Sequence, residues 1–264
     1  MKSTEGRPAR VLALGCHPDD IEFMMAGTFL LLGERGAELH YCNVANGCYG
    51  SNEHTREALV DIRAREGKNA AAYANAVFHP SYADDLHVMY EQPLIRKVAS
   101  LIRNVKPDIL LLPALGDYME DHMNTARVGV TAAFVRGMGL YQTDPPQPHY
   151  DGDIALYHAM PYGLRDALGR SVIPQFYVDI SGVMGRKEQM LNMHASQRAW
   201  LDNSQGIDSY GEKMKAMARE VGKRSQKFGF AEGWIRHNPL GFSSEDYDPL
   251  GTLLKDHINV HMKA

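Results

Sequence analysis

The chain has 264 residues, 44% of them hydrophobic and 23% charged, so it can bury a sizeable core as one large α/β domain. Its net charge is −4 and it contains no basic block, so we expect neither nucleic acid nor an acidic membrane surface as a partner. Three cysteines, Cys16, Cys42 and Cys48, show no disulfide or metal-finger spacing, which indicates a reducing compartment. Because we find no apolar leader and no run long enough to span a bilayer, we predict a cytoplasmic protein.

The first predicted strand, Arg10–Gly15, is a short apolar run that ends in a histidine and two carboxylates. A helical period follows from Asp20 to about Leu32. His17 and Asp20 lie three residues apart at the start of this helix and can turn toward one point, and imidazole with carboxylate is a common partial ligand set for zinc. Asp19 lies between them and is free to act as a base on a water held by the metal. The competing interpretation is that these aspartates only cap the helix.

Further along the chain, apolar runs alternate with segments of helical periodicity. We predict strands at 38–44, 77–78, 108–113, 154–160 and 176–180. We predict helices at 55–76, 92–104, 184–201 and 212–221, and a further helix that runs through Thr131 and Phe134. The proline-rich segment 142–152 is predicted to be a loop. This order is typical of a doubly wound α/β fold.

A second group of polar residues follows the apolar strand 108–113, in the segment 114–122. Ligands of open α/β sheets bind at the carboxyl ends of the strands. Because two such corners on neighbouring parallel strands face the same crevice, His122 can meet His17 and Asp20. His122 is therefore the candidate third metal ligand.

Several motifs in this order resemble the PIG-L/LmbE-like deacetylases. They are His-Pro-Asp-Asp after the first strand, Asp-His after a later strand, and Val-Asp-Ile-Ser before a helix with His-x-Ser-Gln. The resemblance runs from about Val11 to Trp234 and implies a Rossmann-like three-layer α/β/α sandwich with a mostly parallel sheet. It also implies a zinc-dependent enzyme, or one using another divalent metal, that removes acyl groups from amino sugars. We expect a single domain over 1–264, with an N-terminal tail at 1–9 and a C-terminal extension at 235–264.

The resemblance also assigns roles by position. It implies metal ligands at His17, Asp20 and His122, with the general base at Asp19 and a supporting carboxylate at Asp121.

Other positions of the family pattern concern the substrate. Arg63 and Glu66 match the family's Arg-x-x-Glu, whose arginine is implicated in substrate binding, and Asp84 falls where relatives hold a sugar hydroxyl. Glu120 and His158 are further candidates for contact with substrate, since each lies near the carboxyl end of a predicted strand.

Two positions depart from the family pattern. Many relatives carry a histidine where this chain has Met119, and a tyrosine where it has Phe230. Because methionine cannot donate a proton to the leaving amine, we expect Asp19 to return the proton that it took, with Glu120 or His158 as the other candidate acids.

The sequence therefore predicts a metal-dependent hydrolase that removes an N-acyl group from an amino sugar or a related small molecule. The alternatives are an enzyme of the same fold acting on another C–N bond or on a glycoside, and a metal-binding protein without turnover. A nucleotide-binding Rossmann enzyme is disfavoured because no Gly-x-Gly-x-x-Gly follows the first strand. The expected partner is a carbohydrate conjugate, and the resemblance also suggests a homotrimer or homohexamer.

Overall fold

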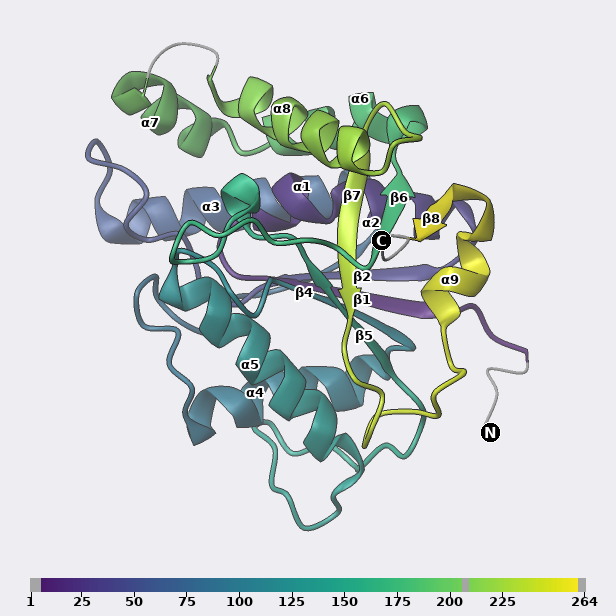
Figure 1. Ribbon diagram of the computed structural model, residues 1–264. Helices are drawn as coiled ribbons and strands as arrows, with labels where there is room; N and C mark the ends of the chain where they lie inside the picture. The colour runs from purple at the N-terminus through teal and green to yellow at the C-terminus, as the bar shows by residue number, and fades with distance from the viewer. Residues whose placement is uncertain (1–5, 206–208, 261–264) are drawn as a thin grey trace.

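A mixed eight-stranded sheet forms the centre of the computed structural model, which describes residues 6–205 and 209–260 (Figure 1). The strand order is β3-β2-β1-β4-β5-β7-β6-β8. The strands are β1 (Arg10–Gly15), β2 (Glu38–Asn43), β3 (Val77–His79), β4 (Ile109–Leu112), β5 (Ala155–Ala159), β6 (Phe176–Asp179), β7 (Ala231–Arg236) and β8 (Ile258–Val260). Pairs from β3 through β5 are parallel, whereas β7, β6 and β8 join antiparallel. The first half of the sheet therefore places several strand ends at one edge.

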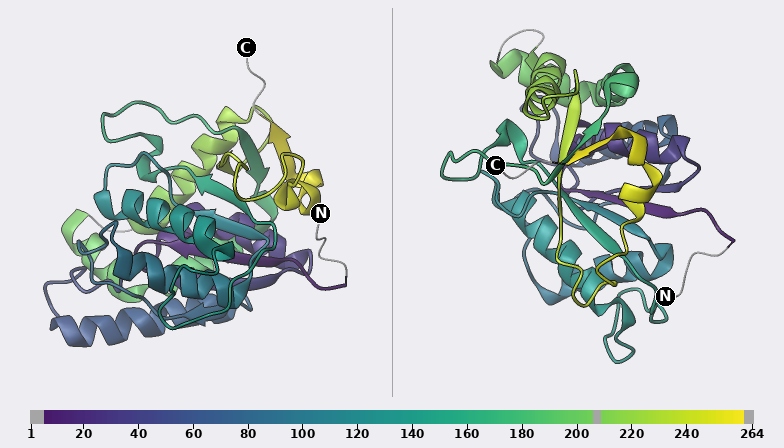
Figure 2. Two further views of the ribbon diagram at one scale, coloured as in Figure 1. Left: turned by 90° about the horizontal axis from the view of Figure 1, so that it is seen from below. Right: turned by 45° about the vertical axis from the view of Figure 1, so that its right-hand side comes forward.

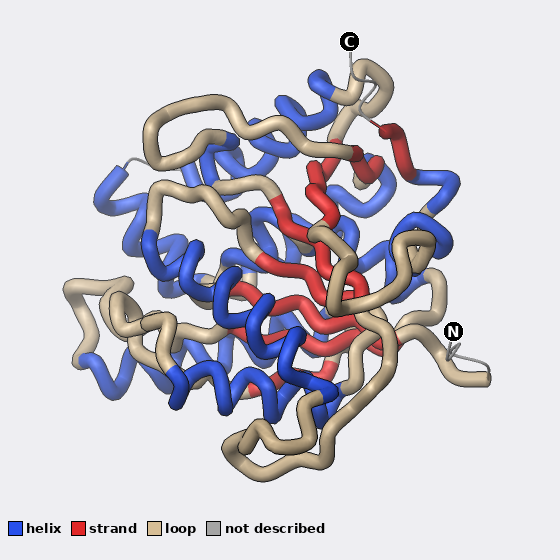
Figure 3. Tube along the Cα trace, turned by 60° about the horizontal axis from the view of Figure 1, so that its bottom comes forward, coloured by secondary structure: helices blue, strands red, loops and turns tan. Residues whose placement is uncertain are grey.

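Helices cover both faces of the sheet, as predicted for a three-layer α/β/α sandwich (Figures 1 and 2). One layer holds α1 (Asp20–Met24), α2 (Ala26–Glu34), α3 (Arg56–Tyr73), α6 (Met184–Asn192), α7 (Ala195–Gln205) and α8 (Ser209–Arg224). The other holds α4 (Gln92–Val105) and α5 (Glu120–Phe134), which lie in front of the strands in Figure 3. A short helix, α9 (Pro249–Leu253), precedes β8. No helix in the described ranges is long and apolar enough to cross a membrane.

Alternate residues of β1 face the two helical layers. Val11 and Ala13 pack with the layer of α1 and α2, while Leu12 and Leu14 pack with that of α4 and α5. All four side chains are fully buried, as expected for a parallel strand covered on both faces. The chain after Gly15 therefore emerges from the middle of the core.

The predicted elements are present, but the structure differs from the prediction in several places, and β8 and α9 were not expected in the polar C-terminal tail. The helix expected over Asp20–Leu32 is two helices, because the backbone breaks at Met25, whose φ is −130°. The helix expected over 184–201 is likewise interrupted between Asn192 and Ala195. The segment 231–236 was not predicted as a strand, yet it pairs with β5 and β6. Its sequence, Ala-Glu-Gly-Trp-Ile-Arg, includes a glycine, has a charged residue at or near each end and shows no regular apolar alternation, so it carries little strand signal of its own.

A buried arginine joins the end of α5 to two distant loops. Arg136 is 8% exposed and donates only to backbone oxygens: Ala133, Gly152, Gly241 and Phe242. The carbonyls of the proline-rich loop and of the segment before α9 thus converge on one guanidinium.

Replacing Arg136 is expected to destabilise the protein. Arg136→Met leaves these buried carbonyls without donors, so we expect the free energy of unfolding to fall by about 3 kcal/mol. Chemical denaturation measures it. Arg127→Met is the matched control, because Arg127 is exposed on α5, the helix that precedes Arg136. Equal stability of the two variants would show that the hydrogen bonds of Arg136 to these carbonyls do not stabilise the fold.

Candidate active site

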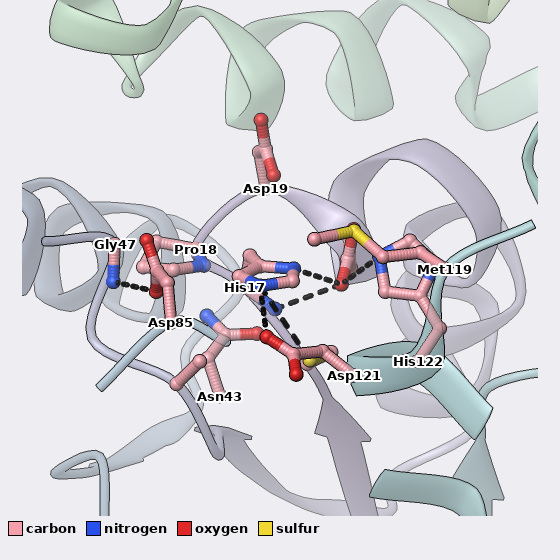
Figure 4. A network of polar contacts seen from close by, with 12 residues as sticks. His17, Pro18, Asp19, Asn43, Gly47, Asp85, Met119, Asp121 and His122 are labelled. Carbon is pink, nitrogen blue, oxygen red and sulfur yellow. Dashed lines mark hydrogen bonds and ion pairs between the residues drawn. The ribbon is translucent and has the colours of Figure 1, made fainter. Parts of the chain in front are cut away.

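The two polar corners predicted from the sequence meet at the carboxyl ends of β1 and β4, which are neighbouring parallel strands. His17 and Asp20 lie in the turn from β1 into α1, and Asp121 and His122 lie in the first turn of α5. Asp117 joins them from the loop between β4 and α5. We call these five residues the histidine–carboxylate cluster (Figure 4 labels His17, Asp121 and His122 of them).

Asp20 lies between the two histidines of the cluster. Its Oδ2 is 3.6 Å from Nδ1 of His17 and 3.4 Å from Nε2 of His122. Donor atoms that share a tetrahedral zinc at about 2.0–2.2 Å lie about 3.3–3.6 Å apart. Each histidine nitrogen therefore lies at ligand spacing from Asp20, while the donors that lie within 4.8 Å of one another are those of Cys16, His17 and Asp20.

The remaining ring nitrogen of each histidine faces a further carboxylate. Nε2 of His17 is 3.2 Å from Oδ2 of Asp121, and Nδ1 of His122 is 3.0 Å from Oδ1 of Asp117. Metal-binding histidines almost always donate their second N–H to such a partner, which fixes ring orientation and tautomer. The donor set thus fits a divalent cation by spacing and by the outer carboxylates.

The cluster is rich in negative charge. Burial acts against the protonated rings, yet Asp20 and Asp117 raise the pKa of His122. Burial likewise opposes ionisation of Asp20, but His122 and His17 lower its pKa. Cys16, whose Sγ is 3.8 Å from Nε2 of His17, adds another nearby donor to His17 and Asp20. Charges arranged in this way favour a bound cation.

Asp19 adopts an unusual backbone conformation. Its φ is 118°, in the region that side-chain-bearing residues rarely occupy, and it is 8% exposed. Its side chain extends away from His17 and His122 (Figure 4), and its Oδ2 accepts a 2.5 Å hydrogen bond from the hydroxyl of Tyr210. Burial raises the pKa of Asp19, while the charge of Arg63 acts in the opposite direction. Strain of this kind persists where surrounding contacts impose it, and it is common at functional sites.

Arg63 of α3 contacts the turn that carries Pro18 and Asp19. It is 2% exposed and its Nη2 donates to the carbonyl of Pro18 at 2.5 Å, whereas Nε and Nη1 are buried without a partner. Gly47 lies over this guanidinium with φ 77°, and a Cβ there would come within 2.6 Å of Nε of Arg63. Only glycine suits this position. Glu66 does not contact this turn in the same way. Its two carboxylate oxygens accept hydrogen bonds from the backbone N–H and the hydroxyl of Ser196, at the start of α7.

A cavity of about 980 Å³ opens beside these residues. His17, Asp19, Asp20, Arg63 and His122 all contribute to its wall. Much of the remaining wall is aromatic, from Phe23, Tyr49, Tyr118, Tyr162, Trp200 and Tyr210. The ring of Tyr118 lies 5.7 Å from that of His122 and 6.0 Å from that of Tyr162, so an aromatic face adjoins the cluster.

Three predicted substrate residues lie outside the wall of this cavity. Asp84 pairs with Asn46 and Arg56, and its neighbour Asp85 lines the cavity instead. Glu120 is exposed at the start of α5. His158 is buried against Pro113 and His237. Only His158 was expected at the end of a strand, and the direction of each of the three side chains depends on packing.

The two departures from the family pattern are unequal. Met119 lines the cavity. Phe230 does not, and its ring instead lies 5.2 Å from the guanidinium carbon of Arg219. Of the two substitutions, only Met119 lies in the site.

His158 makes the stability dependent on pH. Nδ1 donates to the Pro113 carbonyl at 2.8 Å, and burial lowers the pKa of His158 to about 4. The unfolded residue titrates near pH 6.5, so in the window between these values the unfolded chain binds more protons and stability falls as the pH falls. We expect His158 alone to remove about 2 kcal/mol between about pH 7 and about pH 5.

Urea denaturation across this range measures the slope. His158→Gln should flatten it, and His149→Gln, at an exposed histidine, should leave it unchanged. An unchanged slope in His158→Gln would refute the assignment.

Two residues of the site were not predicted. Asp117 lies in the polar segment 114–122 after β4, which was predicted to contribute to the site. An aspartate at this place could therefore have been predicted as a site residue. Tyr210 has no such signal, because it lies in α8 and its bond to Asp19 spans 191 residues.

Comparisons with known proteins concern the family and the fold. Residues 12–133 match the family model PIG-L, described as GlcNAc-PI de-N-acetylase. The chain is 25% identical over 196 residues to a diacetylchitobiose deacetylase of Thermococcus kodakarensis, covering 71% of this chain and 70% of that protein.

Two solved structures share the fold. One is the N,N'-diacetylchitobiose deacetylase of Pyrococcus horikoshii, with TM-score 0.72 and 19% identity over 91% of this chain and 88% of that one. The other is GalB, the 4-carboxy-2-hydroxymuconate hydratase of Pseudomonas putida KT2440, with TM-score 0.73 and 20% identity over 88% of this chain and 97% of that one. Residues 12–133 are therefore similar to the PIG-L family, and the fold of the chain is that of the two solved structures.

Proposed function

We propose that the chain is a metal-dependent hydrolase that removes an N-acyl group from an amino sugar. The observation that carries this proposal is the histidine–carboxylate cluster, in which Asp20 lies 3.6 Å from His17 and 3.4 Å from His122 and each histidine is backed by a further carboxylate. The similarity to deacetylases of amino sugars supports the reaction.

His17, Asp20 and His122 are the proposed ligands, and zinc is the proposed metal. Two imidazoles and one carboxylate form a set that zinc accepts, with a fourth position left for substrate or water. When bound, zinc would polarise the amide carbonyl and lower the pKa of a water to about 7. Asp117 and Asp121 keep the two rings oriented.

The protein's own groups handle the proton and hold the substrate. Asp19 takes a proton from the attacking water and returns it to the nitrogen of the leaving amine, since Met119 has no proton to give. Arg63 offers two unpartnered N–H groups for the oxygens of the substrate. Tyr118 and Tyr162 form an apolar face on which a sugar ring can stack.

Metal analysis and amine release together test the proposal. We expect about one zinc per chain after purification with zinc, and release of amine from N-acetylglucosamine conjugates. Metal without amine release from any acylated amino sugar would overturn the deacetylase assignment and retain the metal site.

A second candidate is addition of water to an unsaturated carboxylic acid. It is favoured by Arg63, a buried cation with two unpartnered N–H groups in the cavity wall, and by GalB, a hydratase of similar fold. Carboxylates are the preferred partners of arginine. An assay for hydration of unsaturated di- and tricarboxylates separates the two candidates. The loss of ultraviolet absorbance of the double bond measures the reaction, and such a loss would favour the hydratase.

A further inference from the structure

Tyr210 has a contact that neither reaction assigns. Its hydroxyl donates to Oδ2 of Asp19 at 2.5 Å, and its side chain is 2% exposed. The ring is held from the other side by Phe23 of α1, at 5.1 Å between centroids and 66° between planes. A buried phenol is therefore fixed with its only proton aimed at the proposed base.

The turn that carries Asp19 is held by hydrogen bonds to both residues of the Pro18–Asp19 peptide. Arg63 donates to the Pro18 carbonyl on one side, and Tyr210 donates to the Asp19 carboxylate on the other. A non-glycine residue at φ 118° costs about 1–3 kcal/mol and persists where its surroundings over-determine it. Both contacts come from helices far from the turn in the sequence, α3 and α8.

We propose that Tyr210 is a positioning residue for Asp19, and this inference rests on Asp19 being the base of the proposed function. The hydroxyl holds Oδ2 of Asp19, a residue of the cavity wall, and so restricts the direction of the carboxylate. A base must be held within hydrogen-bond reach of the proton that it takes, and a misplacement of about 1 Å can cost about 100-fold in rate. The α8 helix thereby supplies a hydroxyl to the site.

Tyr210→Phe removes only the hydroxyl and keeps the ring against Phe23. We expect kcat for an N-acetylglucosamine conjugate to fall about 10- to 100-fold, with KM changed less than about threefold and zinc content unchanged. In the Asp19→Asn background the same substitution should have no further effect on kcat, because the base is already lost.

Tyr157→Phe is the matched control. Tyr157 is also fully buried and donates to an aspartate at 2.5 Å, but its partner Asp248 lies outside the cavity wall. We expect it to lower the urea midpoint as Tyr210→Phe does while leaving kcat unchanged. Equal kcat losses in the two variants, or a kcat within twofold of wild type in Tyr210→Phe, would overturn the proposal.

A measurement without substrate tests the positioning role of Tyr210 separately from the proposed deacetylase reaction. In the metal-free protein, Tyr210→Phe should shift the urea midpoint about twice as far in the wild-type background as in Asp19→Asn, because a hydrogen bond to a carboxylate is worth about twice one to an amide. If no amine is released but the shifts differ, only the reaction is wrong. Equal shifts in the two backgrounds contradict the bond that holds Asp19.

Discussion

Asp19→Asn is expected to retain the metal and lose turnover by about 100- to 10,000-fold, the usual contribution of a general base. Asparagine has nearly the shape of aspartate and tolerates the left-handed backbone region, so the strained turn at φ 118° can persist. Its amide oxygen can still accept from Tyr210. What it cannot do is take the proton of the attacking water.

Single-turnover amine release with elemental analysis of the same sample measures both effects. Asp84→Asn is the matched control, because Asp84 is an aspartate of the neighbouring loops that does not line the cavity. It should keep activity within about twofold. Activity of Asp19→Asn within tenfold of wild type would remove Asp19 from the role of base.

His122→Ala is expected to abolish metal retention, and with it all turnover. The substitution removes the nitrogen that lies 3.4 Å from Asp20 Oδ2 and leaves two proposed ligands, His17 and Asp20. Two ligands do not complete the three-residue set of a catalytic zinc site. The buried carboxylate of Asp117 also loses the imidazole and keeps the backbone N–H of Met119.

Zinc titration against a competing chelator measures the affinity. Asp117→Asn is the graded comparison, since the outer carboxylate only orients the ring, and its loss should weaken zinc binding by about 10- to 100-fold. His158→Gln, at a buried histidine outside the cavity wall, should leave zinc affinity unchanged. Zinc retained at full affinity by His122→Ala would show that the metal is held by other residues, with Cys16 the next candidate.

The sequence predicted the first half of the fold closely. The apolar run Arg10–Gly15 is β1 with those bounds, and the helix expected at 92–104 is α4 at Gln92–Val105. Both are segments whose own residues repeat with the period of their structure. The break at Met25 was missed because the apolar period continues through it, while the backbone turns there.

The edge of the sheet after β5 was the least predictable part. β7 runs antiparallel between β5 and β6, and β8 closes the edge against β6 from within the expected C-terminal extension. Pairing of this kind depends on which strands are already present. It is therefore a property of the assembled sheet and not of the segment's own pattern.

The sequence by itself determined that His17, Asp20 and His122 would share one corner, because strand ends and helix starts are local features and neighbouring parallel strands end at one edge. Only the tertiary structure decided the rest of the site. It directed Asp84, Glu120 and His158 away from the cavity and brought Tyr210 to Asp19 across 191 residues. The physical reason is that side-chain direction and long-range hydrogen bonds are set by packing between elements, which no local pattern encodes.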